Sequence, residues 1–226
     1  MTRFLTVALL VLTIAAVPAV AHADTVTVYD WTVYPFAVNA TAAGGTGGPF
    51  GVHTVGPLLG TSDFMTFCLE LDEHVSWGST YNFTLSDSVI RGGGEASGGA
   101  DPLSNATKFL YYQTRSGDLK WYTDLNLPDD GNKGANIQYA IWSLEGELTA
   151  PAGSAGATLA KYALDHEGDW DALAAAGNRV YAMNLTTGTV HNQSMLALST
   201  VPEPGSLLLF GTGLVGVARA WRKRRG

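Results

Sequence analysis

The chain contains a single cysteine, Cys68, among its 226 residues. One cysteine excludes an intrachain disulfide, the usual reason for cysteine in an exported protein. Four roles stay open: a small buried side chain, an intermolecular disulfide, a catalytic thiol, or a thiol in some other covalent bond. A cysteine–histidine nucleophile would need His74, His166 or His191, and none of these lies in a recognisable protease motif.

Positive charge is also scarce. The chain has 13 Lys and Arg against 20 Asp and Glu. One cation lies near the N-terminus and five lie in the last eight residues, so that residues 24–203 hold seven cations, all 20 acids and a formal charge of −13. Such an acidic surface repels phosphate backbones and anionic lipid, which argues against a nucleic-acid partner. It leaves cation binding open.

No apolar run reaches the length of about 20 residues that a membrane-spanning helix normally needs. Residues 1–23 combine an early cation, an apolar stretch over 4–20, and the small residues Ala21 and Ala23 in an A-x-A pattern. This order is typical of a secretory signal peptide that signal peptidase cuts before Asp24. We therefore expect the chain to be exported.

The last 26 residues combine a Pro-Glu-Pro core, a short apolar run and a cluster of cations. The core is Val201, Pro202, Glu203 and Pro204, and the cations are Arg219, Arg222, Lys223, Arg224 and Arg225. By the positive-inside rule, such cations stay on the cytoplasmic side of the membrane.

This three-part order resembles the PEP-CTERM sorting signal of Gram-negative bacteria. The resemblance implies a membrane-tethered intermediate, cleavage near the Pro-Glu-Pro core by an exosortase-type transpeptidase, and delivery to the cell surface or an extracellular polysaccharide or biofilm matrix. A plain C-terminal membrane anchor is the alternative.

The sequence predicts three segments: a signal peptide (1–23), an ectodomain (24–200) and a sorting or anchor segment (201–226). The expected fold class is α+β. It comprises a β-rich, sandwich- or barrel-like ectodomain with a helical insertion, an N-terminal signal helix and a C-terminal hydrophobic sorting helix. The ectodomain is long enough for one hydrophobic core.

Residue periodicity supports this division of the ectodomain. Alternating apolar and polar residues predict strands over 25–88, and the pattern returns at 179–199 around a hairpin turn at 186–188. Between them, four helical stretches are predicted, one with Ser104 as its N-cap. Another places Ile137, Ala140, Ile141 and Leu144 on one face. The Gly-rich runs are interpreted as loops.

Two short motifs bear on Cys68. Phe67-Cys68 is an aromatic–cysteine pair on a predicted strand, and Ile137-Gln138-Tyr139-Ala140-Ile141-Trp142 begins a predicted helix. Together they resemble the thioester domains of Gram-positive surface adhesins. The resemblance implies that the Cys68 sulfur attacks the Gln138 carboxamide, expels ammonia and forms an internal thioester. Apolar neighbours, namely Phe67, Ile137, Ile141 and Trp142, would shield this bond from water.

Other chemistry is less well supported. Glu70 and Asp72 share a strand face and Glu73 points away, so no metal cage is expected there. The acidic loop Asp124, Asn126, Asp129, Asp130 and Asn132 lacks EF-hand spacing. The aromatics Trp31, Trp77, Trp121 and Trp170 suit either sugar stacking or core packing. No cofactor is predicted.

The expected function is adhesion or matrix association. It includes covalent, single-turnover capture of amines on a matrix polymer or surface protein, so the chain is not expected to be an enzyme. The alternatives are a hydrolase of extracellular polysaccharide and a non-covalent structural or carbohydrate-binding module.

The sorting hypothesis predicts the ends of the mature protein. Secreted material should begin at Asp24 and lack the residues that follow the Pro202-Glu203-Pro204 region, and replacement of Glu203 should impair processing. Peptide mapping of secreted material checks both ends. Recovery of the Arg222–Arg225 cluster in that material would contradict sorting and favour a plain anchor.

Overall fold

The structure is a computed structural model that describes residues 24–31, 40–42, 45–90, 99–117, 119–128 and 131–199. The predicted signal helix, with Ala21 and Ala23, and the predicted sorting helix of residues 201–226 lie outside these ranges. Among the helices of the described part, none has both the length and the apolar character for a membrane span.

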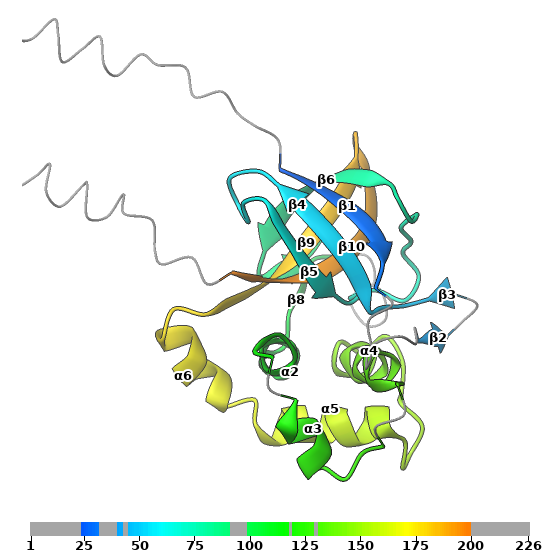
Figure 1. Ribbon diagram of the computed structural model, residues 1–226, viewed down its shortest axis with the longest axis vertical. Coiled ribbons are helices and arrows are strands. Elements are labelled where there is room, and N and C mark those ends of the chain that lie inside the picture. The colour runs from blue at the N-terminus through cyan, green and yellow to red at the C-terminus, as the bar shows by residue number, and fades with distance from the viewer. Residues whose placement is uncertain are drawn as a thin grey trace, which may run out of the picture.

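The ectodomain is a mixed α/β unit built on a six-stranded antiparallel sheet (Figure 1). The strand order is β10-β9-β6-β1-β4-β5. These strands are β1 (Thr25–Asp30), β4 (Phe50–Val55), β5 (Ser62–Thr66), β6 (Thr80–Ser86), β9 (Arg179–Thr187) and β10 (Val190–Ser199). Two small pairs are added, β2 (Thr41–Ala42) with β3 (Gly45–Thr46) and β7 (Ser88–Val89) with β8 (Asp101–Pro102).

The sheet curls until its two outer strands meet. Directly after β5, the segment Phe67–Leu69 runs beside β10, where Cys68 and Met195 form an antiparallel bridge. The Leu196 N–H donates to the Phe67 carbonyl at 3.1 Å, and the Leu69 N–H donates to the Ser194 carbonyl at 2.9 Å. This closure removes the open edges that a flat sheet would present.

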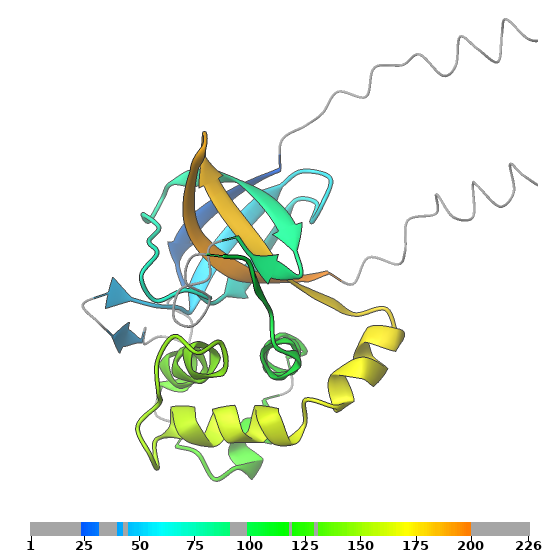
Figure 2. The same cartoon turned by 180° about the vertical axis from the view of Figure 1, so that it is seen from behind.

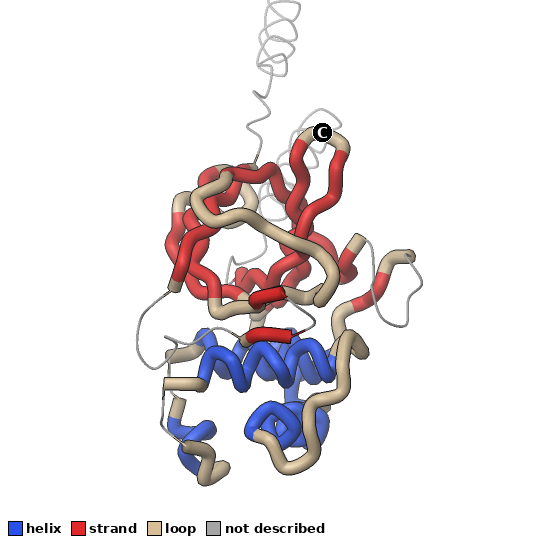
Figure 3. Tube along the Cα trace, turned by 90° about the vertical axis from the view of Figure 1, so that its right-hand side faces the viewer, coloured by secondary structure: helices blue, strands red, loops and turns tan. Residues whose placement is uncertain are grey.

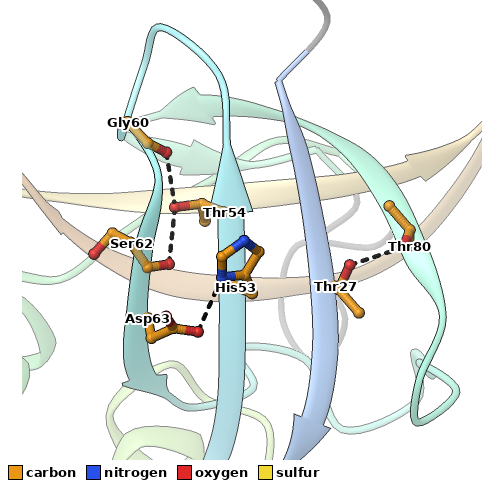
Figure 4. A network of polar contacts seen from close by, with 7 residues as sticks. All are labelled: Thr27, His53, Thr54, Gly60, Ser62, Asp63 and Thr80. Atoms are coloured by element: carbon orange, nitrogen blue, oxygen red, sulfur yellow. Dashed lines mark hydrogen bonds and ion pairs between the residues drawn. The ribbon is translucent and has the colours of Figure 1, made fainter.

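Polar side chains join neighbouring strands on the curled sheet (Figure 4). The Thr27 and Thr80 hydroxyls lie 2.8 Å apart across β1 and β6, and His53 Nδ1 lies 3.0 Å from an Asp63 carboxylate oxygen across β4 and β5. Val26 and Val28 are fully buried on either side of Thr27. This alternation is what the sequence predicts for a half-buried strand.

Five helices of the described part lie on one side of the sheet (Figures 1 and 2). They are α2 (Asn105–Arg115), α3 (Lys120–Asp124), α4 (Lys133–Leu144), α5 (Ala155–Asp165) and α6 (Asp169–Ala175). All follow β8 and precede β9, as expected for a helical insertion. The views place α2 and α4 next to the sheet and α5 beyond them (Figure 3). The short helix α3 was not predicted.

Helix α4 is buried on two sides. Ile137, Ala140 and Ile141 belong to a hydrophobic cluster shared with α2 and α5. Ala135 and Trp142 belong to a second cluster, which contains Cys68 and side chains from the curled sheet. The helix is therefore less amphipathic than its periodicity predicts, because its second buried side faces the sheet.

One hydrogen-bond network links the start of α2 to the end of α4. The Ser104 hydroxyl oxygen accepts from the Thr107 N–H at 3.0 Å, as predicted for an N-cap, and its O–H donates to Glu145 at 2.8 Å. Glu145 is the C-cap residue of α4. Burial raises the pKa of its carboxyl, and the hydrogen bonds from Ser104 oppose that rise.

This network predicts unequal costs for two cap deletions. Ser154 caps α5 in the same way, because its hydroxyl oxygen accepts from the Ala157 N–H. Among the described residues, no carboxylate is hydrogen-bonded to the Ser154 hydroxyl. Ser154→Ala should therefore cost about 1 kcal/mol of unfolding free energy. Ser104→Ala should cost roughly 1–3 kcal/mol more, because it also leaves Glu145 buried with fewer donors. Denaturant unfolding measures both; equal costs would contradict the linking role of Glu145.

Candidate functional site

The two predicted motifs meet at the Gln138 carboxamide. Gln138 lies in the first half of α4 and is 0% exposed. Its Oε1 accepts from the Cys68 N–H at 2.9 Å, and its Nε2 donates to the Cys68 carbonyl at 2.9 Å. The structure thus brings together two residues that are 70 positions apart in the chain. An ordinary, solvent-exposed helix residue is the other role that the sequence allows for Gln138, and the burial of its side chain contradicts that role.

A second backbone donor reaches the same oxygen. The Gly48 N–H lies just before β4 and donates to Gln138 Oε1 at 2.9 Å. Two backbone N–H groups therefore converge on one carbonyl oxygen, at the distances typical of an oxyanion hole. This arrangement would stabilise negative charge on Oε1 if a nucleophile attacked the carboxamide carbon.

The close approach of this loop requires glycine at two positions. A Cβ on Gly47 would lie 2.4 Å from the Trp142 ring, and one on Gly48 would lie 3.1 Å from Gln138 Oε1. Backbone hydrogen bonds between Ala40 and both glycines hold the loop in place. Gly47 and Gly48 were predicted only to lie in a loop. The available signal was two adjacent glycines directly before Pro49 and a strand.

The Cys68 thiol is 3% exposed. Burial raises the pKa of the thiol far above its usual range, the hydrogen bond from the Gly48 N–H opposes that rise, and the charge of Glu73 adds to it. The thiol is therefore protonated at neutral pH, unlike the thiolate of a cysteine protease. The Gly48 N–H therefore lies close to both the Cys68 sulfur and Gln138 Oε1.

The predicted shielding residues are buried, but Trp142 alone among them shares the hydrophobic cluster of Cys68; Phe67, Ile137 and Ile141 belong to the other cluster. Ile137 and Ile141 are fully buried, and Trp142 is 2% exposed. Phe67 is also buried and packs edge-on against Tyr111, with ring centroids 6.4 Å apart. Water is thus excluded from the helix side of the site.

On another side, Cys68 lines a pocket of about 180 Å³. Of the three histidines considered with Cys68, His74 lines this pocket. His166 stacks on Phe109 in the helical layer, and His191 lies in β10.

A separate acidic cluster lies near the site. Ligand atoms of Glu70, Asp72 and Glu147 fall within 4.8 Å of one another. Glu70 and Asp72 were predicted to share one face, whereas Glu147 lies in the loop after α4 and was not predicted to join them. Its carboxylate accepts from the Leu71 N–H at 3.0 Å, and burial raises its pKa. These bonds give the cluster a structural role in joining that loop to the sheet.

The remaining candidate residues are dispersed. Asp124 pairs with Lys120 within α3, at 2.6 Å, whereas Asp129 and Asp130 lie outside the described residues. Trp170 is buried and Trp121 stacks on Tyr162, so both belong to the packing of the helices. Among the large hydrophobic side chains, Trp77 is 46% exposed and lines the pocket beside Cys68.

Comparison with known proteins identifies the C-terminal segment. Residues 200–225 match the PEP-CTERM protein-sorting motif. This confirms the predicted tail and implies export, a membrane-anchored sorting intermediate and processing by an exosortase. No curated protein and no solved structure matches the chain. The predicted residues within the tail and the predicted signal cleavage site lie outside the described residues and stay predictions.

The glycine loop predicts a steric effect of added methyl groups. Gly47→Ala should lower the unfolding free energy by roughly 1–3 kcal/mol, because the new Cβ overlaps the buried Trp142 ring. Gly168→Ala is the matched control: a Cβ there meets nothing within 4 Å and its φ is −66°. The control should change stability by less than about 0.5 kcal/mol. Equal effects of the two variants in thermal or denaturant unfolding would contradict the close approach.

Proposed function

We propose that this exported, exosortase-processed protein captures amine-bearing partners covalently, through an internal thioester between Cys68 and Gln138. One observation carries the proposal. The Gln138 carboxamide is fully buried against the Cys68 backbone, and its carbonyl oxygen lies 2.9 Å from each of two backbone N–H groups. A glutamine with a purely structural role needs hydrogen-bond donors for its carbonyl oxygen. It does not need a neighbouring thiol that accepts from the same Gly48 N–H.

Thioester formation would be an intramolecular acyl transfer. The Cys68 sulfur adds to the Gln138 Cδ, and the negative charge that develops on Oε1 is stabilised by the N–H groups of Gly48 and Cys68. The C–N bond then breaks, the thiol proton ends on the leaving nitrogen, and ammonia departs. Proximity of the two groups lowers the activation barrier of such reactions. The proton balance needs no external base, which fits a thiol held in its neutral form.

Capture would transfer the Gln138 acyl group from the Cys68 sulfur to an incoming amine. A primary amine adds to the thioester carbonyl, the C–S bond breaks, and the partner becomes attached to Gln138 as an amide while Cys68 regains its proton. An amide is a poorer acyl donor than a thioester, so the product is stable and the site reacts once. We therefore infer stoichiometric attachment without turnover.

Matrix polymers and surface proteins that carry amines are the proposed partners, and adhesion or biofilm association is the proposed role. Export by the sorting pathway supports this assignment, because it sends the site out of the cytoplasm. The polysaccharide hydrolase and the carbohydrate-binding module are weaker alternatives. The partly buried acids Glu145 and Glu147 each accept a hydrogen bond from a backbone N–H group, that of Ser104 and that of Leu71, and so hold backbone in place.

The proposal predicts a mass deficit. Freshly purified protein in amine-free buffer should weigh less than its mature sequence by one ammonia, and Cys68 should resist alkylation after unfolding in acid. Incubation with methylamine should add the mass of one methylamine and release one thiol. Intact mass spectrometry without reductant measures both changes. A wild-type protein of full sequence mass contradicts the thioester.

Two variants separate the chemistry from the fold. Gln138→Glu keeps the shape of the side chain but has no amide nitrogen to expel, and Cys68→Ala removes the sulfur. Both should show full sequence mass and no reaction with methylamine. The linkage closes a loop of 70 residues, which in the entropic model stabilises the fold by about 4 kcal/mol. Both variants should therefore unfold at lower denaturant concentration than the unreacted wild type.

A further inference from the structure

The pocket beside Cys68 has features that the thioester alone does not require. It is lined by Glu73 and His74 on the segment after β5, and by Phe50, Val75 and Trp77. Phe50 and Trp77 pack edge-to-face with ring centroids 5.8 Å apart. An acid, an imidazole and a pair of aromatic rings thus line the same pocket as Cys68.

The size of the pocket limits what can enter. At about 180 Å³ it is smaller than the roughly 300–1,000 Å³ of ordinary small-molecule sites. A single extended side chain fits this description better than a sugar ring or a polymer backbone does. Phe50 and Val75 offer apolar contact to an alkyl stem, and the exposed face of Trp77 suits a cation.

The charge of the pocket favours a positively charged group. Glu73 lies close enough to Cys68 for its carboxylate to act on the buried thiol. An anionic, partly buried wall attracts cations and raises their local concentration. A hydroxyl nucleophile, such as that of a sugar, gains nothing from this charge.

We propose that this pocket is the acceptor subsite of the thioester and that it selects a primary ammonium on a flexible alkyl chain, such as a lysine side chain. This inference rests on the proposed function. Glu73 binds the ammonium, and the alkyl stem lies along Phe50 and Trp77. His74 accepts one proton from the ammonium, which leaves a neutral amine to attack the Gln138 carbonyl. The proton then passes to solvent, the C–S bond breaks, and the thiolate takes the second amine proton.

The test compares a charged and an uncharged nucleophile on the purified exported protein. Butylamine is a cation at neutral pH, whereas hydroxylamine is mostly neutral. Glu73→Gln should retain the mass deficit but slow consumption of the thioester by butylamine at least about tenfold, with the hydroxylamine rate changed by less than about twofold. Glu167→Gln removes the same charge from the exposed turn between α5 and α6 and should change neither rate.

His74→Asn and Trp77→Ala provide independent readouts. His74→Asn should slow the reaction with butylamine and leave the hydroxylamine rate unchanged, because it removes the proposed base. Trp77→Ala removes an exposed side chain and should slow butylamine selectively, which tests the subsite even if Glu73→Gln does not fold.

The outcomes distinguish the two proposals. Full sequence mass of the wild type overturns the thioester and the subsite with it. A mass deficit in the wild type, combined with variants that react with butylamine as fast as the wild type, overturns the subsite and leaves the thioester standing. Equal slowing of both nucleophiles also overturns the subsite, because it would show that Glu73 positions the thioester instead of binding the amine.

Discussion

The structure depends on the carboxamide of Gln138, which is buried where an unpaired polar group would lower the stability of the fold. Gln138 is 0% exposed, and its carboxamide makes three hydrogen bonds, all to backbone groups of other segments. Both acceptor positions of the oxygen and one of the two N–H groups are thus used. Loss of these bonds would leave the loop at Gly48 and the segment at Cys68 with unsatisfied buried groups, which costs more than the bonds contribute. The carboxamide therefore fixes three parts of the chain at once.

The segment Met65–Leu71 is the part of the sheet to which the helical layer is attached. The Tyr111 hydroxyl of α2 donates to the Met65 carbonyl at 3.0 Å. Gln138 of α4 binds both the N–H and the carbonyl of Cys68, and Glu147 accepts from the Leu71 N–H. Strand β10 holds the opposite side of the segment through its own hydrogen bonds. The segment therefore contributes to both hydrophobic clusters, Met65, Phe67 and Leu69 to one and Cys68 to the other.

Local patterns in the sequence predicted the local structure well. Ser104 caps α2 as expected, the hairpin turns at Gly188, and β1 and β6 alternate as predicted. Strands β4 and β5 do not alternate, because successive residues of each are buried. The helix α3 was missed because five residues show no period. The site was predictable only as a pair of motifs. The approach of Gly48, the arrival of Glu147 and the pocket of Glu73 depend on contacts between distant segments, which periodicity does not encode.

The closure of the sheet sets an order of events during export. A chain crosses a membrane from its N-terminus, so the segment that carries Cys68 emerges long before its partner in β10; the hydrogen bond between Thr66 and Leu196 spans 130 positions. Contacts of such separation form slowly. Until β10 emerges the thiol lacks its cover, and β10 is followed almost at once by the sorting motif at residues 200–225. Completion of the fold around Cys68 and arrival of the sorting signal at the membrane are thereby synchronised by topology alone.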